Sequence, residues 1–96
     1  MGVSETVSTL LEQLHKADTN FERAELVEGL KAHELSCAEV SAIVGTFTFS
    51  SKKRAMLVSL YPKLPADERP GFVDVLEGAL DYDFDRKDVM RELKLG

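Results

Sequence analysis

Residues 38–60 read AEVSAIVGTFTFSSKKRAMLVSL, and residues 71–93 read GFVDVLEGALDYDFDRKDVMREL. The two stretches repeat one pattern with a spacing of 33 residues. The identities are Val40/Val73, Gly45/Gly78 and Leu60/Leu93. A fixed period in this range is typical of folds that stack one supersecondary unit on the next. The repeat therefore indicates that much of this chain serves architecture.

The composition is that of one small globular domain spanning residues 1–96, with disorder expected only at the ends, 1–3 and 95–96. Hydrophobic residues make up 44% of the chain and charged residues 30%, which is too apolar for a disordered chain. No apolar run approaches the length of a membrane span. The net charge of −5 disfavours binding to nucleic acid or to anionic lipid.

The single cysteine, Cys37, cannot form an internal disulfide, which predicts a reducing, cytoplasmic location. No His or Asp stands near it in the sequence to activate its thiol, and no Gly-rich phosphate loop occurs. We therefore expect Cys37 to be a small residue in the first turn of a helix. We expect no cofactor and no enzymatic activity.

Apolar residues recur at helical spacing between short breaks, and each break offers a residue suited to cap a helix. Residues 19–22 and 36–39 each form a capping-box pattern. The second helix is expected over about 20–32, the third from 36 to about 47 and the fourth over about 51–61. The expected caps are Ser4, Thr19, Ser36, Ser50 or Ser51, Asp67, and Asp83 or Asp85.

The same spacing predicts which side chains face the core. Pro62 is expected to end the fourth helix and to push Tyr61 out of the helical region, whereas Pro70 fits the first turn of the fifth helix. The residues expected to face inward are Val7, Leu10, Leu11, Leu14, Phe21, Ala24, Val27, Leu30, Val40, Ile43, Val44, Phe47, Ala55, Met56, Leu57, Val58, Leu60, Phe72, Val75, Leu76, Leu80, Val89, Met90 and Leu93.

The predicted helix starts alternate in two series, each stepping by about 31–33 residues. One series begins near Ser4, Ser36 and Asp67, and the other near Thr19, Ser50 and Asp83. We therefore predict an all-α fold of five or six short helices packed as three helical hairpins in a short solenoid-like array. Strand-like alternation over residues 45–49 is the weaker reading, because no partner strand is evident.

Two segments resemble a small helical family catalogued as a domain of unknown function. They run from Leu35 to Pro62, with a Phe-x-Phe-Ser joint and a following basic residue, and from Asp67 to Arg86. The resemblance extends over residues 17–94, although Arg69-Pro70 and Leu80 depart from the family's pattern. It implies an all-α interaction module and implies no chemistry.

Acidic residues stand at positions 1, 3, 5 and 12 of a loop-like stretch, as in an EF-hand: Asp81, Asp83, Asp85 and Glu92. Position 6, which needs glycine to turn the loop, is Arg86. The equivalent joint at residues 48–51 contains no carboxylate. We therefore expect helix-capping acids and no metal site, with a calcium-responsive module as an alternative function.

Basic residues open two of the predicted helices, and they are the weak candidates for binding: Lys52, Lys53, Arg54, Arg86 and Lys87. We expect these cations to form a solvated helix face, and a basic patch for an acidic partner or phosphate is the alternative. Cations in the first turn oppose the helix dipole, which suggests a further use such as pairing with Glu25, Glu28 or Asp74. Separately, Gly2 fits an N-myristoylation pattern, and only its acylation would bring this acidic chain to a membrane.

These observations predict a non-catalytic protein–protein interaction or scaffolding domain, monomeric, that binds another protein and no nucleic acid. The binding surface is expected in a groove between hairpins or on the exposed face of an end hairpin. A second alternative is a six-helix, death-fold-like adaptor that assembles with copies of itself.

Overall fold

The computed structural model describes residues 3–31 and 33–95, and these residues form six α-helices and no strand. The all-α class is confirmed, and the strand alternative for residues 45–49 is wrong. The elements are α1 (Glu5–Lys16), α2 (Asn20–Glu28), α3 (Cys37–Val44), α4 (Ser50–Leu60), the 3₁₀ turns η1 (Tyr61–Lys63) and η2 (Arg69–Gly71), α5 (Phe72–Ala79) and α6 (Asp83–Glu92). None of these helices is long and apolar enough to cross a membrane.

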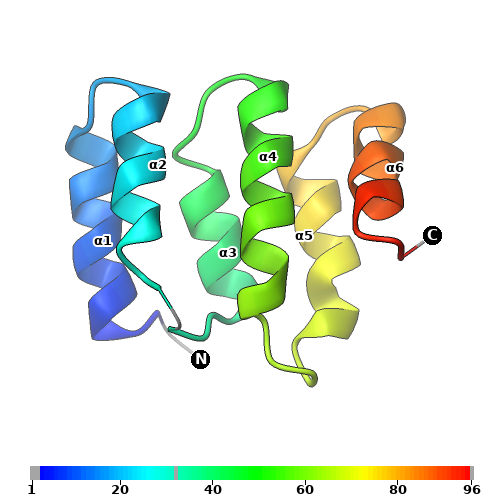
Figure 1. Cartoon of the computed structure of the whole chain (residues 1–96), viewed down its shortest axis with the longest axis horizontal. Coiled ribbons are helices and arrows are strands. Elements are labelled where there is room, and N and C mark those ends of the chain that lie inside the picture. Colours follow the sequence, from blue (N-terminus) through cyan, green and yellow to red (C-terminus); the bar gives the residue numbers. More distant parts are fainter. Residues whose placement is uncertain (1–2, 32, 96) are drawn as a thin grey trace.

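The helices alternate in direction, so the starts of α2, α4 and α6 lie at one end of the molecule and those of α1, α3 and α5 at the other (Figure 1). The most extensive contacts join α3 to α5 in one row and α4 to α6 in a second row, and α1 extends the first row by packing on α3. Across the rows, α1 packs on α2 and α3 on α4. The helices α5 and α6 share no comparably extensive contact, so the arrangement as three hairpins is not confirmed.

One core runs through the described helices, because the buried apolar side chains form a single cluster that draws on all six. Most residues expected to face inward do so. Two expectations are wrong: Phe21 is 73% exposed, and Ala55 is exposed as well. The buried apolar residues are Val7, Leu10, Leu14, Val27, Leu30, Leu35, Val40, Ile43, Val44, Phe47, Met56, Leu57, Leu60, Leu64, Phe72, Val75, Leu76, Leu80 and Val89.

Three helices begin where their capping residues predict. The hydroxyls of Ser4, Thr19 and Ser36 accept hydrogen bonds from the amides three residues further on. The box at Ser36 is complete, because the Glu39 carboxylate also accepts from the Ser36 amide. At Thr19 the box is half formed. The Thr19 hydroxyl accepts from the Glu22 amide, but the Glu22 carboxylate accepts from that hydroxyl, at 3.4 Å, and not from the Thr19 amide.

The predicted caps of the other three helices are wrong. The N-cap positions belong to Phe49, Gly71 and Tyr82, and none of these residues makes a side-chain capping bond. Asp67 lies in the turn before η2, where the neighbouring Glu68 carboxylate accepts a hydrogen bond from the Cys37 amide of α3. Ser50 and Asp83 are each the first residue of their helix. Contacts distant in sequence therefore set these starts.

Two helix ends and one proline also differ from prediction. The helix α2 ends at Glu28, before a turn in which Lys31 has a φ of 51°, and α3 ends at Val44. Tyr61 keeps helical angles (φ −52°, ψ −45°) despite Pro62, because the chain continues as the 3₁₀ turn η1. Its ring packs edge-on against Phe72 at 4.8 Å, which holds it in place.

Carboxylates tie the row of α1, α3 and α5 together at the end where these helices begin. The buried Glu39 carboxylate accepts from the amides of Ser4 and Ser36 at 2.8 and 2.9 Å. Burial alone would raise the pKa of Glu39, but these hydrogen bonds outweigh burial and lower it. In the same way, Glu68 accepts from the Cys37 amide at 2.8 Å and joins α3 to the segment before α5.

The same contact confirms that Cys37 is a structural residue in the first turn of α3. Its Sγ donates to the Glu68 carbonyl at 2.9 Å. Burial, followed by the negative charge of Glu68, raises the pKa of the thiol. A thiol held in its protonated form is a poor nucleophile.

Candidate functional site

Large aromatic side chains are exposed where α2, α4 and α6 begin. These helix starts lie at the end of the molecule opposite the starts of α1, α3 and α5 (Figure 1). We call this set, Phe21, Phe49, Tyr82 and Phe84, the aromatic edge. Phe21 is 73% exposed and Phe49 is 74% exposed. Tyr82 and Phe84 stack on each other with ring centroids 5.6 Å apart. Four of the seven Phe and Tyr residues in the chain thus lie in solvent on one edge.

The backbone of Phe49 is strained. Its φ of 70° lies in the region that favours glycine, and its ψ of 132° places it outside the left-handed helical basin. A bulky residue in such a conformation costs on the order of 1–3 kcal/mol. Strain of this kind persists where surrounding contacts enforce it, and it is concentrated at functional sites.

The turn before α2 and the turn before α6 are each held by an arginine in the same way. Arg23 donates to the Ala17 carbonyl and to the Asn20 side chain, both at 2.9 Å. Arg86 donates to the Leu80 carbonyl at 2.6 Å, and its guanidinium lies 3.8 Å from the Asp83 carboxylate. Each arginine therefore satisfies a carbonyl at the end of the preceding helix and fixes the turn that carries an exposed phenylalanine.

The sequence carries a signal for this arrangement that apolar periodicity and capping patterns do not reveal. Residues 18–23 read DTNFER and residues 81–86 read DYDFDR. Both share the pattern Asp-x-Asn/Asp-Phe-Glu/Asp-Arg, at a spacing of 63 residues. The joint before α4 lacks the pattern, and it is the joint that holds the strained Phe49.

The turn before α2 and the turn before α4 are hydrogen-bonded directly to each other. The Asn20 amide donates to both the carbonyl and the hydroxyl of Thr48 at 3.0 Å, and its carbonyl accepts from the Thr48 amide at 3.2 Å. Phe21 and Phe49 each follow one member of this bridge in the sequence. The bridge therefore fixes the spacing between the starts of α2 and α4.

Below the Asn20–Thr48 bridge, a groove of about 520 Å³ separates α2 from α4. We call it the α2–α4 groove. It lies between the second helices of the first two predicted hairpins, and its use as a binding surface stays a prediction. It is lined by Ala24, Val27, Glu28, Ala55, Met56, Ser59 and Lys63.

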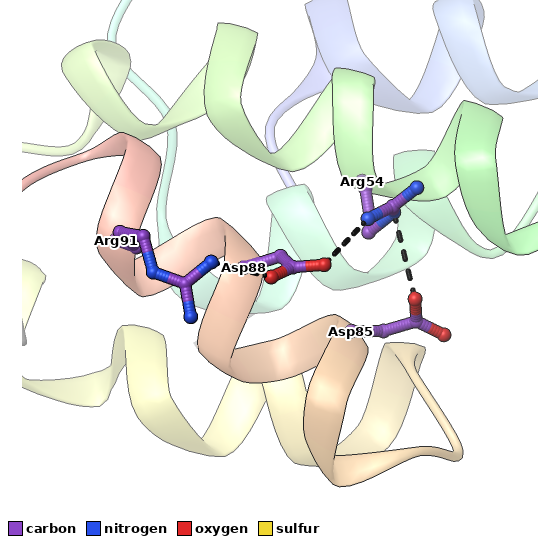
Figure 2. Close-up of polar contacts among 4 residues, drawn as sticks. All are labelled: Arg54, Asp85, Asp88 and Arg91. Carbon is purple, nitrogen blue, oxygen red and sulfur yellow. Dashed lines mark hydrogen bonds and ion pairs between the residues drawn. The ribbon is translucent and has the colours of Figure 1, made fainter.

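Arg54, one of the predicted binding residues, is instead bound to α6. Figure 2 shows its guanidinium between two carboxylates, with Nη1 3.0 Å from Asp88 and Nε 3.6 Å from Asp85. Asp88 also pairs with Arg91 at 2.9 Å. The longer distance is an ion pair without a hydrogen bond, so the buried Nε has no hydrogen-bond partner among the described residues. The suggested pairing of Arg54 with Glu25, Glu28 or Asp74 is therefore wrong.

The other predicted cations divide into two groups. Arg86 and Lys87 serve α6 itself, since both lie near Asp83, with Lys87 Nζ 3.0 Å from its carboxylate. Lys52 and Lys53 lie in the first turn of α4 and form no ion pair with the described residues. The five cations therefore form no common patch, and only these two lysines are free to meet a partner.

The acidic residues of the calcium alternative do not form a loop. Asp83, Asp85 and Glu92 lie within the helix α6, where Asp83 pairs with cations and the buried Asp85 faces Arg54. Within residues 3–31 and 33–95, no group of three acidic, His or Cys side chains is placed to hold a metal ion. A calcium response stays a prediction, which NMR shifts of the amides of residues 81–92 on titration with Ca²⁺ would test.

Gly2, where the sequence fits an acylation pattern, lies outside the described residues.

Comparison with known proteins identifies a family model described as a domain of unknown function (DUF4476), which matches residues 4–93. Because the match covers nearly the whole chain, the chain belongs to this family. No curated protein and no solved structure matches it.

Proposed function

We propose that this member of the DUF4476 family is a non-catalytic module that binds another protein through the aromatic edge, in a scaffolding or regulatory role. The observation that carries the proposal is the exposure of Phe21, Phe49, Tyr82 and Phe84 on one edge. Large apolar side chains exposed together at one end of a small protein are typical of interaction sites. Aromatic side chains supply much of the binding energy at such sites.

The strain at Phe49 supports the same proposal. Glycine would relieve the conformation, yet this position carries a phenylalanine whose ring contributes little to the core, because it is 74% exposed. A residue that costs stability and adds little packing is best explained by a role outside folding. Binding through the ring is such a role.

The buried ionisable groups support binding rather than catalysis. Within residues 3–31 and 33–95, the buried charged residues are Glu39 and Asp85, and both make contacts between elements distant in sequence. The unpaired Cys37, which is held as a thiol, supports the proposed cytoplasmic location. We propose a monomer, because the aromatic edge suits a partner of different structure.

The proposal is tested by affinity capture from cells with the wild-type chain and with Phe21→Ser, Phe49→Gly and Phe84→Ser variants. Val73→Ser is the matched control, because Val73 is an exposed apolar residue of α5, away from the aromatic edge. We expect a set of proteins that the wild type and the control retain and the three edge variants lose. Equal capture by all variants would overturn the proposal.

Light scattering of the purified chain addresses the death-fold alternative. A mass that stays that of one chain up to millimolar concentration agrees with the proposal. A mass that rises with concentration, and falls again in the edge variants, would replace it with homotypic assembly.

A further inference from the structure

We propose that the α2–α4 groove binds a short amphipathic helix of a partner protein, whose two polar flanks carry opposite charges. The inference rests on the proposed protein-binding function and adds the chemistry of the partner. It uses the groove, its two ends and its rims, and it does not depend on the rings of the aromatic edge.

The floor of the groove is apolar and is made partly of small residues. Ala24 and Ala55 leave space along α2 and α4, and between them the buried Val27 and Met56 reach the groove. Small side chains let a helix approach closely, and methionine adapts its shape to different apolar partners. The floor therefore suits aliphatic side chains projecting from one face of a helix.

The lining excludes two other common forms of bound peptide. Proline-rich segments bind grooves lined by aromatic rings, and no residue that lines this groove is aromatic. Extended segments add to the edge of a sheet, and the described residues form no sheet. An amphipathic helix lying in an apolar groove is the remaining common mode.

The ends of the groove limit the length of the bound helix. The lining of the groove runs from Ala24 to Glu28 along α2 and from Ala55 to Lys63 along α4 and η1. The longer side covers eight residue steps, or roughly 12 Å, so the groove accommodates about two helical turns. Such a helix presents two apolar anchors one turn apart, at positions i and i+4.

The rims carry opposite charges. Glu28 lies on the α2 side and Lys63 on the side of α4 and η1, and they form no ion pair with each other. A bound helix is therefore met by an acidic group on one flank and a basic group on the other. A helix with one basic and one acidic flank is therefore favoured over a helix whose two flanks carry charges of the same sign.

The neighbouring junction shows the same chemistry within the chain. There α6 lies along the other side of α4, burying Val89 and placing Asp85 and Asp88 against Arg54 (Figure 2). A short helix is thus docked beside α4 by apolar side chains, Val89 with the partly buried Met90 and Leu93, together with charges on its flank. The α2–α4 groove offers an apolar floor and charged rims of the same kind.

The test uses three designed 12-residue helical peptides, each with leucines at positions 4 and 8, and fluorescence anisotropy with the whole chain. The flanks are mixed in charge in the first peptide, all acidic in the second and all basic in the third. We expect the wild type to bind the mixed peptide about fivefold more tightly than the other two. Glu28→Lys should shift the preference to the acidic peptide, and Lys63→Glu should shift it to the basic peptide.

Ser59→Trp fills the groove and should weaken binding of the mixed peptide at least tenfold. Ser41→Trp is the matched control, since Ser41 is an exposed helical serine of α3 outside the groove. Failure of the mixed peptide to bind, equal loss in both tryptophan variants, or an unchanged preference in the charge variants would overturn the proposal.

Affinity capture separates this inference from the proposed function. If Phe49→Gly loses a cellular partner that Ser59→Trp retains, the groove inference fails and the proposed function stands. If neither variant loses any partner, both fail. Loss in Ser59→Trp with retention in Ser41→Trp supports the groove inference, and loss of the same partner in Phe49→Gly supports the proposed function as well.

Discussion

The two junctions that α4 makes with its neighbours differ sharply, although they stand in the same place in successive repeats. On one side α6 packs on α4, Arg54 bridges the two helices through Asp85 and Asp88, and a pocket of only about 200 Å³ remains. On the other side α2 leaves a groove of about 520 Å³ whose rims carry Glu28 and Lys63. The repeat therefore sets where helices lie, and a few side chains decide whether a junction is closed or open.

The difference follows from residue size and charge placement. The α4–α6 junction buries Val89 and pairs Arg54 with two acids, although the Arg54 Nε lacks a hydrogen bond. The pocket that remains there, about 200 Å³, is less than half the size of the α2–α4 groove. The α2–α4 junction places two alanines opposite each other and leaves its charges apart. An open junction beside a closed one is the asymmetry expected of a repeat fold whose surface has been adapted for binding.

The largest effect is expected from opening the closed junction with Asp85→Asn. Because Asp85 is buried, its loss leaves Arg54 without a close counter-charge at Nε, and we expect the free energy of unfolding to fall by about 2 kcal/mol. Urea denaturation measures this change. Asp83→Asn, in the exposed first turn of α6, is the control and should cost about 0.5 kcal/mol. Equal costs would mean that the Arg54 bridge does not close the junction.

A smaller effect is expected at the α1–α3 junction, which is closed by the Glu39 carboxylate. Glu39→Gln should lower the free energy of unfolding by about 1.5 kcal/mol at neutral pH, because the two amides lose a charged acceptor.

The same junction should depend on pH. The pKa of Glu39 is lowered by folding, so its contribution is complete above its ordinary pKa of 4.5 and is lost as pH falls through the lower value in the folded protein. Urea denaturation from pH 7 to pH 3 should therefore show a smaller decline in the variant than in the wild type. Parallel declines would show that Glu39 is not the group that titrates.

A gain in stability is expected at the start of α4. Phe49→Gly removes the strain at φ 70°. Because glycine also raises the entropy of the unfolded chain, we expect a net rise of about 1 kcal/mol in the free energy of unfolding. Phe21→Gly, at an exposed position within a helix, should instead destabilise by about 1 kcal/mol. Thermal unfolding compares the two. Destabilisation by Phe49→Gly would contradict the account of this residue.

The smallest effect is expected from Lys52→Glu and Lys53→Glu. Neither lysine is paired with a described residue, and acidic side chains suit the first turn of a helix, so each change should stabilise the fold by about 0.5 kcal/mol. Arg54→Glu is the contrasting variant, since it places a third acid between Asp85 and Asp88. Similar stability of all three variants in urea would show that Arg54 is no more engaged than its neighbours.

The sequence predicted the features of this molecule that depend on local chemistry. The caps at Ser4, Thr19 and Ser36 were identified because each hydroxyl bonds an amide only three residues away. The periodic apolar positions likewise identified most of the core. The later starts were missed because Phe49, Gly71 and Tyr82 make no capping bond that their own residue types would signal.

The candidate site was predicted less well, because it depends on pairs distant in sequence. Arg54 meets acids more than thirty residues away, so its partners could not be read from helix spacing. Phe21 occupied an apolar position in the α2 pattern and was assigned to the core, yet it follows Asn20, whose bridge to Thr48 places it at an exposed edge. The shared pattern at residues 18–23 and 81–86 was the one sequence signal that grouped Phe21 with Phe84.

The difference between the two junctions is tested most directly by NMR of the amides of the whole chain as the mixed-charge peptide is added. The account predicts that shifts concentrate on both sides of the open junction, at Ala24, Val27, Ala55 and Met56, and spare Asp85 to Val89 across the closed one. Shifts centred on the α4–α6 junction, or none at saturating peptide, would contradict it.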